Sequence, residues 1–480
     1  MTDISMCSLR NNISTMNPST LPEFRVLYIL IDGISDNGVK AYGMKTPLQY
    51  GNFPYFDALA AGGLNGLHDP VQSGLACGSD TAHMSMFGYD PFKLYNGRGA
   101  YESMGSGIPM DYNEIAFKSN FAYMNDETLC VERRRVDREF TSWGLDLCAD
   151  LNNIKIPGYD KDYKVTVLHA TEHRCGVKIS GPNLSSEITD TDPIHDNKLL
   201  RKSKAIKESN SDAVRTADIV NKLTEAIRVK LNAHPINTKR KAEGKAYTNI
   251  VLLRGCGAKL KVEGLKERQG LKGFMIAPTA VIAGIGITFG IDIKKAEGAT
   301  GYYDSDYKSK GKVALENMTS GEYNFGFLHI KGVDDSGHDG DLKMKSELIT
   351  RINEMIGIII TQLRQDELKQ SHKVKYIILL TGDHTTPIEF REHSYEPVPI
   401  AISTVVSACL SQHTLADIKE AKDIDEIDKA LCMLRDNVVK FSELDACEGS
   451  LGRFQGSEMM EVIKRFKEAC AKCILDTTKH

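Results

Sequence analysis

The sequence predicts an α/β protein whose mostly parallel sheet is sandwiched between layers of helices. Continuous apolar runs rich in strand-forming residues occur at 26–31, 323–330 and 375–380, and such runs are typical of strands covered on both faces. Stretches with the spacing of amphipathic helices separate them, as at 54–61 and 342–363. This alternation favours parallel pairing, because parallel strands need a long crossover connection.

The composition is that of an ordinary globular protein without marked charge. The 480 residues carry a net charge of −4 and are long enough for about two or three domains. We therefore expect no nucleic-acid partner and no binding to anionic membranes. The 11 cysteines form no paired zinc-type spacing, and the first 20 residues lack the layout of a secretory leader. Free thiols and a cytoplasmic location are expected.

The amino-terminal part of the chain begins with residues 1–23, which we expect to form a loose tail. The first predicted strand follows, and a helix over 54–61 ends at a pair of glycines. Residues 88–113 are rich in turn formers. This first part therefore combines elements of the parallel sheet with long connections.

From about residue 114 to residue 269 the texture of the sequence changes. Residues 116–124 and 164–169 alternate like half-buried strands. Residues 213–231 have helical periodicity, and the lysine-rich stretch 235–245 is expected to be a charged loop. The α/β rhythm returns at about residue 270, so this middle segment is a candidate separate domain of α+β type.

Two segments leave alternatives open. Residues 274–291 contain no charged side chain and are long enough to be considered for a membrane span. Glycines and Pro278 nevertheless lower the hydrophobicity of this segment. A buried helix with a turn is preferred there. The charged stretch 133–138 is either a solvated edge or part of a phosphate site.

Three of the apolar strands stop at acidic loops, which hold Asp32, Asp334 and Asp383. In an open parallel sheet the ligand site lies at the carboxyl ends of the strands, so we expect these carboxylates to converge on one edge. Taken alone, an aspartate after a strand is often only a cap or a turn former. Nearby in the sequence are three histidines, His338, His384 and His393.

This mixture of carboxylates and imidazoles without thiolates is typical of a metal site. It suits Mn²⁺, Zn²⁺ or Co²⁺, and Mg²⁺ also fits. Together with a serine hydroxyl, the six side chains offer enough ligands for two ions. Two ions about 3.5–4 Å apart are a known device for phosphoryl transfer, in which one activates a hydroxyl and the other holds the phosphoryl oxygens.

The serine is Ser79, in the stretch Gly78-Ser79-Asp80-Thr81-Ala82-His83. A hydroxyl in the first turn of a helix meets unpaired backbone N–H groups and the positive end of the helix dipole, a setting that favours phosphate. The alternative is that Ser79 only caps the helix. The acidic and histidine clusters further along the chain favour a chemical role for its hydroxyl.

Taken together and in this order, the motifs resemble those of the archaeal-type, cofactor-independent phosphoglycerate mutases of the alkaline phosphatase superfamily. The resemblance extends from about residue 24 to residue 460. Besides the Ser79 stretch, the matching segments are Leu30-Ile31-Asp32-Gly33, Gly88-Tyr89-Asp90-Pro91, Thr171-Glu172-His173-Arg174, Asp190-Thr191-Asp192-Pro193, Gly298-Ala299-Thr300-Gly301, Asp334 to Gly340, Gly382 to Pro387, Glu392-His393-Ser394 and Leu451-Gly452-Arg453.

The resemblance implies an alkaline-phosphatase-like, metal-binding domain over 24–113 and 270–480, interrupted by an inserted domain over 114–269 that holds glycerate. It implies two divalent ions, with Mn²⁺ as the first expectation and Mg²⁺, Co²⁺ or Zn²⁺ as alternatives. Asp32, Ser79, Asp383 and His384 would hold one ion, and Asp334, His338 and His393 the other.

The resemblance also implies the reaction. Ser79 would accept the phosphoryl group of 3-phosphoglycerate and return it to the other hydroxyl, giving 2-phosphoglycerate in glycolysis or gluconeogenesis without 2,3-bisphosphoglycerate. His173 and Arg174 would contact the substrate. Asp190 is a candidate for proton transfer, and Arg254 for the carboxylate or phosphate; the plainer interpretations are a turn residue and a surface ion pair. Lys312 is a further candidate phosphate contact.

Other functions stay open at this stage. The chief alternative is a metal-dependent hydrolase of phosphate or sulfate esters from the same superfamily, and the other is a binding protein that has lost activity. Tyr395 stands where the family pattern suggests glycine, and the stretches 196–212 and 259–272 are longer than usual. These departures affect loop geometry and the contacts of any homo-oligomer, not the expected metal ligands.

Overall fold

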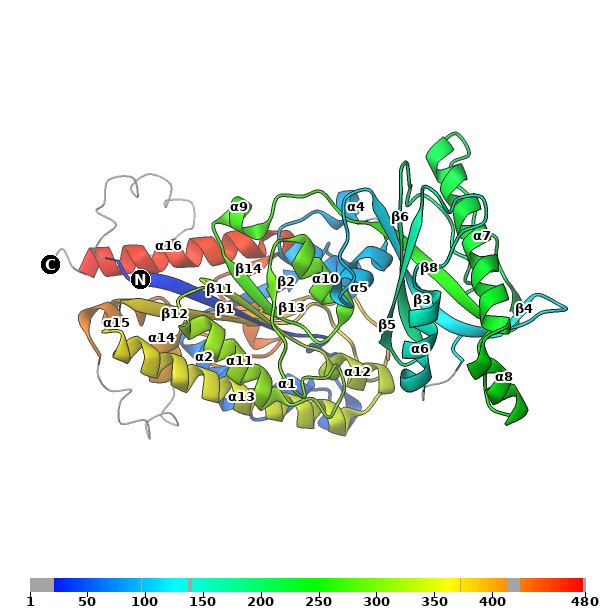
Figure 1. Cartoon of the computed structure of the whole chain (residues 1–480). Coiled ribbons are helices and arrows are strands. Elements are labelled where there is room, and N and C mark those ends of the chain that lie inside the picture. Colours follow the sequence, from blue (N-terminus) through cyan, green and yellow to red (C-terminus); the bar gives the residue numbers. More distant parts are fainter. Residues whose placement is uncertain (1–20, 96, 137–139, 372, 412–423, 478–480) are drawn as a thin grey trace.

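The computed structural model describes residues 21–95, 97–136, 140–371, 373–411 and 424–477. The expected loose tail lies almost wholly outside the described residues. The rest forms two β-sheets with their helices, one of eight strands and one of six, which occupy opposite ends of the molecule in Figure 1.

The larger sheet contains the predicted apolar strands. Its members are β1 (Glu23–Ile31), β2 (Gly63–Asp69), β9 (Gly273–Ile276), β10 (Asp292–Ile293), β11 (Phe325–Ile330), β12 (Val374–Thr381), β13 (Val398–Thr404) and β14 (Gly452–Gln455). They lie in the order β10-β9-β11-β1-β12-β13-β2-β14. β1 pairs in parallel with β11 and β12, whereas β13 runs antiparallel to β12 and β2. The sheet is therefore mostly parallel, as predicted, with one reversed strand.

Both faces of this sheet are buried. Along β1, Val26 and Tyr28 belong to one hydrophobic core, and Leu27 and Ile29 belong to the other, as the two-residue period of a strand requires. Figure 1 shows helices on either side of the sheet. One face carries α3 (Ser79–Met86), α5 (Arg98–Gly105), α9 (Leu265–Gln269), α10 (Ala280–Thr288), α15 (Glu426–Leu431) and α16 (Met459–Thr477). The other carries α2 (Pro54–Ala61), α11 (Tyr307–Thr319), α13 (Leu342–Lys369) and α14 (Val405–Ser411). The predicted α/β fold class is confirmed.

The remaining helical segments are short and lie in connections. They are η4 (Lys40–Tyr42), α1 (Pro47–Tyr50), α4 (Pro91–Leu94), α12 (Gly332–Asp339), η7 (Asp445–Glu448) and η8 (Gly456–Glu458). The segment considered for a membrane span divides into β9 and the buried helix α10. In the part of the chain that the structure describes, no helix combines the length and the apolar character that crossing a membrane requires.

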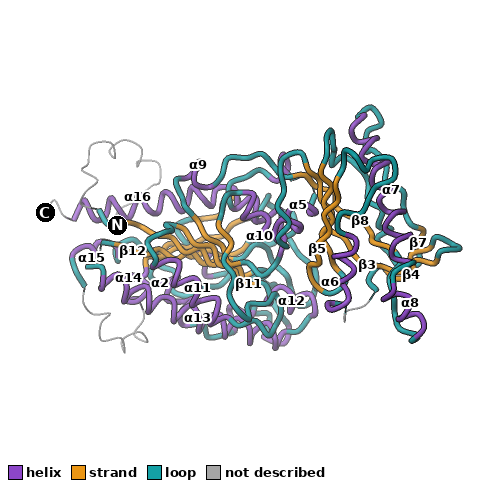
Figure 2. Tube along the Cα trace, in the orientation of Figure 1, coloured by secondary structure: helices purple, strands orange, loops and turns teal. Residues whose placement is uncertain are grey.

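The smaller sheet is antiparallel throughout. It consists of β3 (Glu114–Asn125), β4 (Cys130–Arg133), β5 (Lys164–Thr171), β6 (Arg174–Ser180), β7 (Lys198–Leu199) and β8 (Ile250–Ala258). One of its faces packs on α6 (Thr141–Leu151) and α7 (Ser211–Asn232), so that Phe117 and Val167 share a core with Leu223. The opposite face points toward the larger sheet (Figure 2).

The expectation of a charged loop over 235–245 is wrong, because Pro235–Ala242 forms helix α8. His234 caps it by accepting a hydrogen bond from the N–H of Ile236, and Pro235 occupies its first position, both of which favour a helix start.

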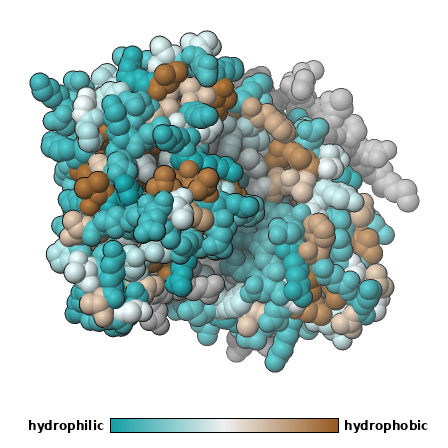
Figure 3. Space-filling view, turned by 90° about the vertical axis from the view of Figure 1, so that its right-hand side faces the viewer, coloured by the Kyte–Doolittle hydropathy of each residue, from teal (hydrophilic) through white to brown (hydrophobic). Residues whose placement is uncertain are grey.

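Seen from the end of the molecule that carries the smaller sheet, the surface is mostly hydrophilic and is hollowed near its middle (Figure 3). Each cysteine within the described ranges is a free thiol, as expected.

Candidate metal centres and catalytic serine

The three predicted acidic loops meet at one edge of the larger sheet. Asp32 follows β1, Asp383 follows β12, and Asp334 lies in α12, which begins just after β11. These strands are parallel neighbours in the order β11-β1-β12, so their carboxyl ends coincide. All three carboxyl side chains are buried.

One set of candidate metal ligands consists of Asp32, Asp383 and His384, whose ligand atoms all lie within 4.8 Å of one another. His384 Nε2 is 3.3 Å from Asp32 Oδ1 and 3.4 Å from Asp383 Oδ2. Neither of these two carboxylate oxygens has a hydrogen-bond partner among the described residues, although both are buried. Buried carboxylate oxygens without such partners are costly unless a cation neutralises them, so the donor set fits a metal ion.

The second set consists of Asp334, His338 and His393, whose ligand atoms also lie within 4.8 Å of one another. His338 Nδ1 donates to the carbonyl oxygen of Arg391 (2.9 Å), and His393 Nδ1 donates to that of Cys77 (2.8 Å). Because a carbonyl only accepts, the Nδ1 atoms carry the protons. The two Nε2 atoms lie 3.1 Å apart, and each lies 3.4 Å from an Asp334 carboxylate oxygen. A cation bound among these atoms would replace the Nε2 protons that hydrogen-bond to Asp334. Such outward Nδ1 bonds are typical of metal-binding histidines.

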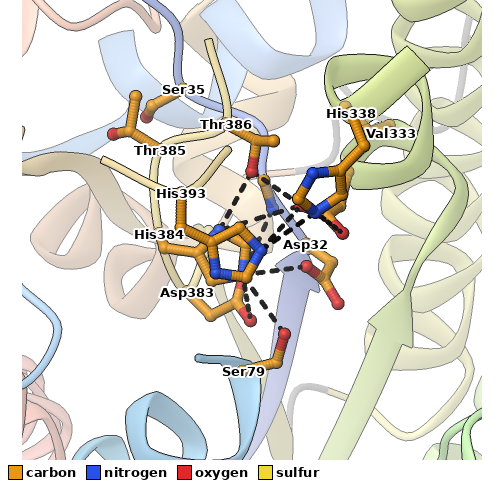
Figure 4. A network of polar contacts seen from close by, with 12 residues as sticks. Asp32, Ser35, Ser79, Val333, His338, Asp383, His384, Thr385, Thr386 and His393 are labelled. Carbon is orange, nitrogen blue, oxygen red and sulfur yellow. Dashed lines mark hydrogen bonds and ion pairs between the residues drawn. The ribbon is translucent and has the colours of Figure 1, made fainter. Parts of the chain in front are cut away.

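The two sets adjoin each other and the serine. The rings of His384 and His393 stack with their centres 3.6 Å apart. Ser79 Oγ lies 3.2 Å from His384 Nε2 (Figure 4). Gly78, and not Ser79, is the cap residue of α3; Ser79 is its first helical residue. The capping interpretation of Ser79 is therefore wrong, and its hydroxyl points instead toward the candidate ligands.

The surroundings shift the pKa values of these groups in opposite directions. Burial, assisted by the negative charge of Asp32, raises the pKa of Asp383 to about 7. Burial also works against the charge of Asp334, but hydrogen bonds from His338 and His393 hold its pKa well below the usual range. The hydrogen bond to Asp334 in turn raises the pKa of His338 to about 9. The edge is thus an acidic site that attracts positive charge.

Lys331, which was not predicted as a site residue, lies in the middle of the acidic edge. Its ammonium group contacts Asp334, and it lies 3.8 Å from Asp32 Oδ2 and 3.5 Å from Asp335 Oδ1. Burial opposes its charge, yet these carboxylates raise its pKa overall. The available signal was its place in the sequence, directly after the strand that leads to Asp334.

A cavity of about 1000 Å³ opens over Ser79 between the two sheets. Its lining includes the metal-ligand candidates Asp32, Asp334, His338 and His393. Five basic side chains also line it, namely Arg98, Lys118, Arg135, Arg174 and Lys331. This arrangement suits a small, multiply charged anion, because guanidinium and ammonium groups bind carboxylates and phosphates well.

The predicted substrate-contacting residues are placed differently from one another. Arg174 lines the cavity. His173 is buried beside it on the chain and is not among the lining residues. Arg254 stands opposite Lys118 across the β3–β8 pair, so both belong to the sheet face that looks toward the cavity. Asp190 Oδ1 accepts a hydrogen bond from the N–H of Gly255 (2.7 Å).

The stretch 133–138 and Lys312 are the other basic candidates for phosphate binding that the sequence offers. Arg135, in the charged stretch 133–138, lines the cavity, whereas Arg134 forms a two-bond ion pair with Asp192 (2.6 and 2.7 Å); residues 137–139 lie outside the described residues. Lys312 is exposed and lies 3.9 Å from Glu316 on the same helix. It is not among the residues that line the cavity and forms a surface ion pair.

Fold and site together define an α/β protein with two candidate metal centres beside a serine hydroxyl. Comparison with known proteins agrees with this class. A family model described as 2,3-bisphosphoglycerate-independent phosphoglycerate mutase matches residues 60–237. A relative of the same name from Saccharolobus solfataricus is 34% identical over 452 residues, which cover 94% of this chain and 99% of the relative.

Two solved structures share the fold over nearly the whole chain. A protein from Pyrococcus horikoshii is 27% identical, with a TM-score of 0.70 and coverage of 94% of this chain and 98% of that one. A cofactor-independent phosphoglycerate mutase from Thermoplasma acidophilum is 25% identical, with a TM-score of 0.64 and coverage of 92% and 99%.

The chain belongs to the family of 2,3-bisphosphoglycerate-independent phosphoglycerate mutases. The family resemblance and the enzyme class, an isomerase, are confirmed.

Proposed function

We propose that this protein interconverts 3-phosphoglycerate and 2-phosphoglycerate through a phosphoserine at Ser79, at a site that binds two divalent metal ions and needs no 2,3-bisphosphoglycerate. The observation that carries this proposal is the position of Ser79 Oγ, 3.2 Å from His384 Nε2 and beneath a cavity with basic walls. A serine hydroxyl among metal ligands is suited to accept a phosphoryl group.

The proposed ligands divide between the two sets. Asp32, Ser79, Asp383 and His384 would hold one ion, and Asp334, His338 and His393 the other. Mn²⁺ is the first choice for such carboxylate and imidazole donors, with Mg²⁺, Co²⁺ or Zn²⁺ as alternatives. When bound, the ions would lower the pKa of the Ser79 hydroxyl and neutralise the charge of the phosphoryl oxygens.

The residues of the chain would then act in two transfers. Ser79 Oγ loses its proton and bonds to phosphorus while the bond between phosphorus and the 3-oxygen of the substrate breaks, and that oxygen takes up a proton. The 2-oxygen of the same glycerate then loses its proton and bonds to phosphorus while the Ser79 Oγ–phosphorus bond breaks, and Ser79 Oγ takes back a proton. Asp190 is the candidate proton carrier, because partial burial raises its pKa.

The glycerate would have to stay in the site between the transfers. Arg174 in the cavity wall, with His173 in the turn just before β6 and Arg254 on β8 of the same sheet, would hold its carboxylate, since a guanidinium fork pairs well with carboxylates. We propose that residues 114–269 form the inserted substrate domain and that 24–113 and 270–480 form the phosphatase-like domain. Excluding water from the closed cavity would favour transfer over hydrolysis.

The proposal is tested by product analysis with the purified full-length chain, 3-phosphoglycerate and Mn²⁺, without added bisphosphoglycerate. We expect 2-phosphoglycerate to form and a chelator to abolish its formation. Release of inorganic phosphate at the rate of substrate loss would instead support the hydrolase alternative. A cytoplasmic location is part of the same proposal, which the free thiols support.

A further inference from the structure

Thr386 lies between the two candidate ligand sets without belonging to either. It follows Asp383 and His384 in the loop after β12, and its side chain is fully buried. Thr386 Oγ1 is 2.6 Å from Asp334 Oδ1 and 3.1 Å from His384 Nδ1. Asp334 Oδ1 and His384 Nδ1 are 3.9 Å from each other, too far for a direct hydrogen bond. The Thr386 hydroxyl therefore bridges them, and Figure 4 shows it directed toward His384.

The chemistry of the three groups fixes the direction of both hydrogen bonds. A hydroxyl has one proton to donate, and a carboxylate can only accept. Thr386 therefore donates to Asp334 and accepts from the Nδ1–H of His384. This bond selects the His384 tautomer whose Nε2 has a free lone pair. Nε2 is the atom that faces Ser79 Oγ, Asp32 and Asp383.

The surrounding backbone holds Thr386 in this place. The N–H of Thr386 donates to the carbonyl oxygen of Ser35 (3.2 Å), and Lys345 Nζ donates to the carbonyl oxygen of Thr386 (2.9 Å). Glycines leave room for the residue: a Cβ added at Gly33 would lie 2.6 Å from Thr386 Oγ1, and one added at Gly337 would lie 2.5 Å from its carbonyl oxygen. The hydroxyl is thus set in position before any ion binds.

We infer that Thr386 is a positioning residue that couples the two metal sites, orienting His384 in one set and Asp334 in the other through a single hydroxyl. The inference rests on the proposed two-metal function. Removing a residue that hydrogen-bonds to a metal ligand commonly lowers metal affinity by about 10–100-fold. Because one hydroxyl serves both sets, its loss affects the binding of both ions.

The test is calorimetric titration of the purified full-length chain with Mn²⁺, comparing Thr386→Val with Thr386→Ser. Valine keeps the shape and removes the bridge, so we expect Mn²⁺ affinity to fall about 10–100-fold; serine keeps the hydroxyl and restores affinity to within a few-fold of wild type. Thr385→Val is the matched control, because the Thr385 hydroxyl bonds to the carbonyl of Glu396 and to no candidate ligand. The Mn²⁺ affinity of Thr385→Val should equal that of wild type.

Two results would overturn the inference, and only one of them would also overturn the proposed function. If wild type binds two Mn²⁺ ions and Thr386→Val binds them equally well, the inference fails while the proposed function stands. If wild type binds no Mn²⁺, the proposed function fails and the inference fails with it. Should Thr386→Val not fold, Thr386→Cys, a similar-sized and weak hydrogen bonder, is expected to show the same loss of affinity.

Discussion

Strand β12 has a cluster of buried charged side chains at each of its ends, and the two clusters differ in how completely their polar atoms are paired. At its start, Lys375 contacts Asp428 of α15, and Arg364 of α13 bonds to Asp428 (2.7 Å) and to Glu367 (2.9 Å). Among the described residues, this structural cluster contains two cationic and two anionic side chains, and all four are buried. The opposite charges meet directly and join two helices to the strand.

The cluster beyond the other end of β12 differs because it leaves buried carboxylate oxygens without hydrogen-bond partners among the described residues. Asp32, Asp334 and Asp383 gather around a single lysine, Lys331, and histidines, and carboxylate oxygens of Asp32 and Asp383 lack hydrogen-bond partners among the described residues. Burying unpaired negative charge is expensive, so a fold retains it where a cation compensates. The comparison distinguishes a cluster that stabilises the fold from one that binds ions.

The largest expected effect concerns the serine beside the acidic cluster. Ser79→Ala should lower turnover of 3-phosphoglycerate by about 10³-fold or more, because it removes the proposed nucleophile. A coupled steady-state assay measures this effect. Ser85→Ala, the same substitution in the same helix, should leave turnover near that of wild type. Comparable turnover in both variants would exclude Ser79 from the chemistry.

Asp383→Asn and Asp428→Asn test the comparison directly, since each neutralises one buried carboxylate. Asp383→Asn should weaken Mn²⁺ binding by about 100-fold or more, because losing a ligand costs at least as much affinity as losing a residue that supports one. It should not lower the Tm of the metal-free protein, because it relieves repulsion from Asp32. Asp428→Asn should leave Mn²⁺ affinity unchanged and lower the Tm, because it removes an anionic partner of the buried Arg364 and Lys375, and breaking such a buried pair costs about 3–5 kcal/mol. Calorimetry and thermal denaturation measure the two effects, and the opposite pattern would contradict the distinction.

The basic wall of the cavity should affect substrate binding more than metal binding. Arg174→Ala is expected to raise KM about 10-fold, equivalent to about 1.4 kcal/mol of lost binding. Arg254→Ala should have a smaller effect, since Arg254 is not among the residues that line the cavity. A larger KM change for Arg254→Ala would mean that the glycerate lies deeper over β8 than we propose.

The smallest expected effect is a pH dependence from the structural cluster. Burial raises the pKa of Glu367 to about 7 from an ordinary 4.5. A carboxyl group whose pKa is higher in the folded state contributes stability below the unfolded pKa, and this contribution is lost as the pH rises through the folded pKa. The Tm of wild type minus that of Glu367→Gln should therefore fall between pH 4 and pH 8 (~4 units, spanning both pKa values). A constant difference would contradict the assigned shift.

The sequence predicted the acidic edge well because the signal is local. An apolar strand that ends in Asp32 or Asp383 places that residue at the carboxyl end of a parallel sheet whatever the rest of the chain does. The positions of Lys331, Lys118 and Thr386 depend on contacts between segments far apart in the chain, which no periodicity reveals. The direction of β13 and the formation of α8 were likewise missed, since apolar runs do not encode strand polarity and charged residues mask a short capped helix.

The most direct test of the account is an anomalous-scattering map from crystals of the full-length chain grown with Mn²⁺. The account predicts two peaks per chain, about 3.5–4 Å apart, one among Asp32, Asp383 and His384 and the other among Asp334, His338 and His393, with Ser79 Oγ at the first. A map with no peak at this edge, or with Mn²⁺ bound only elsewhere, would contradict it.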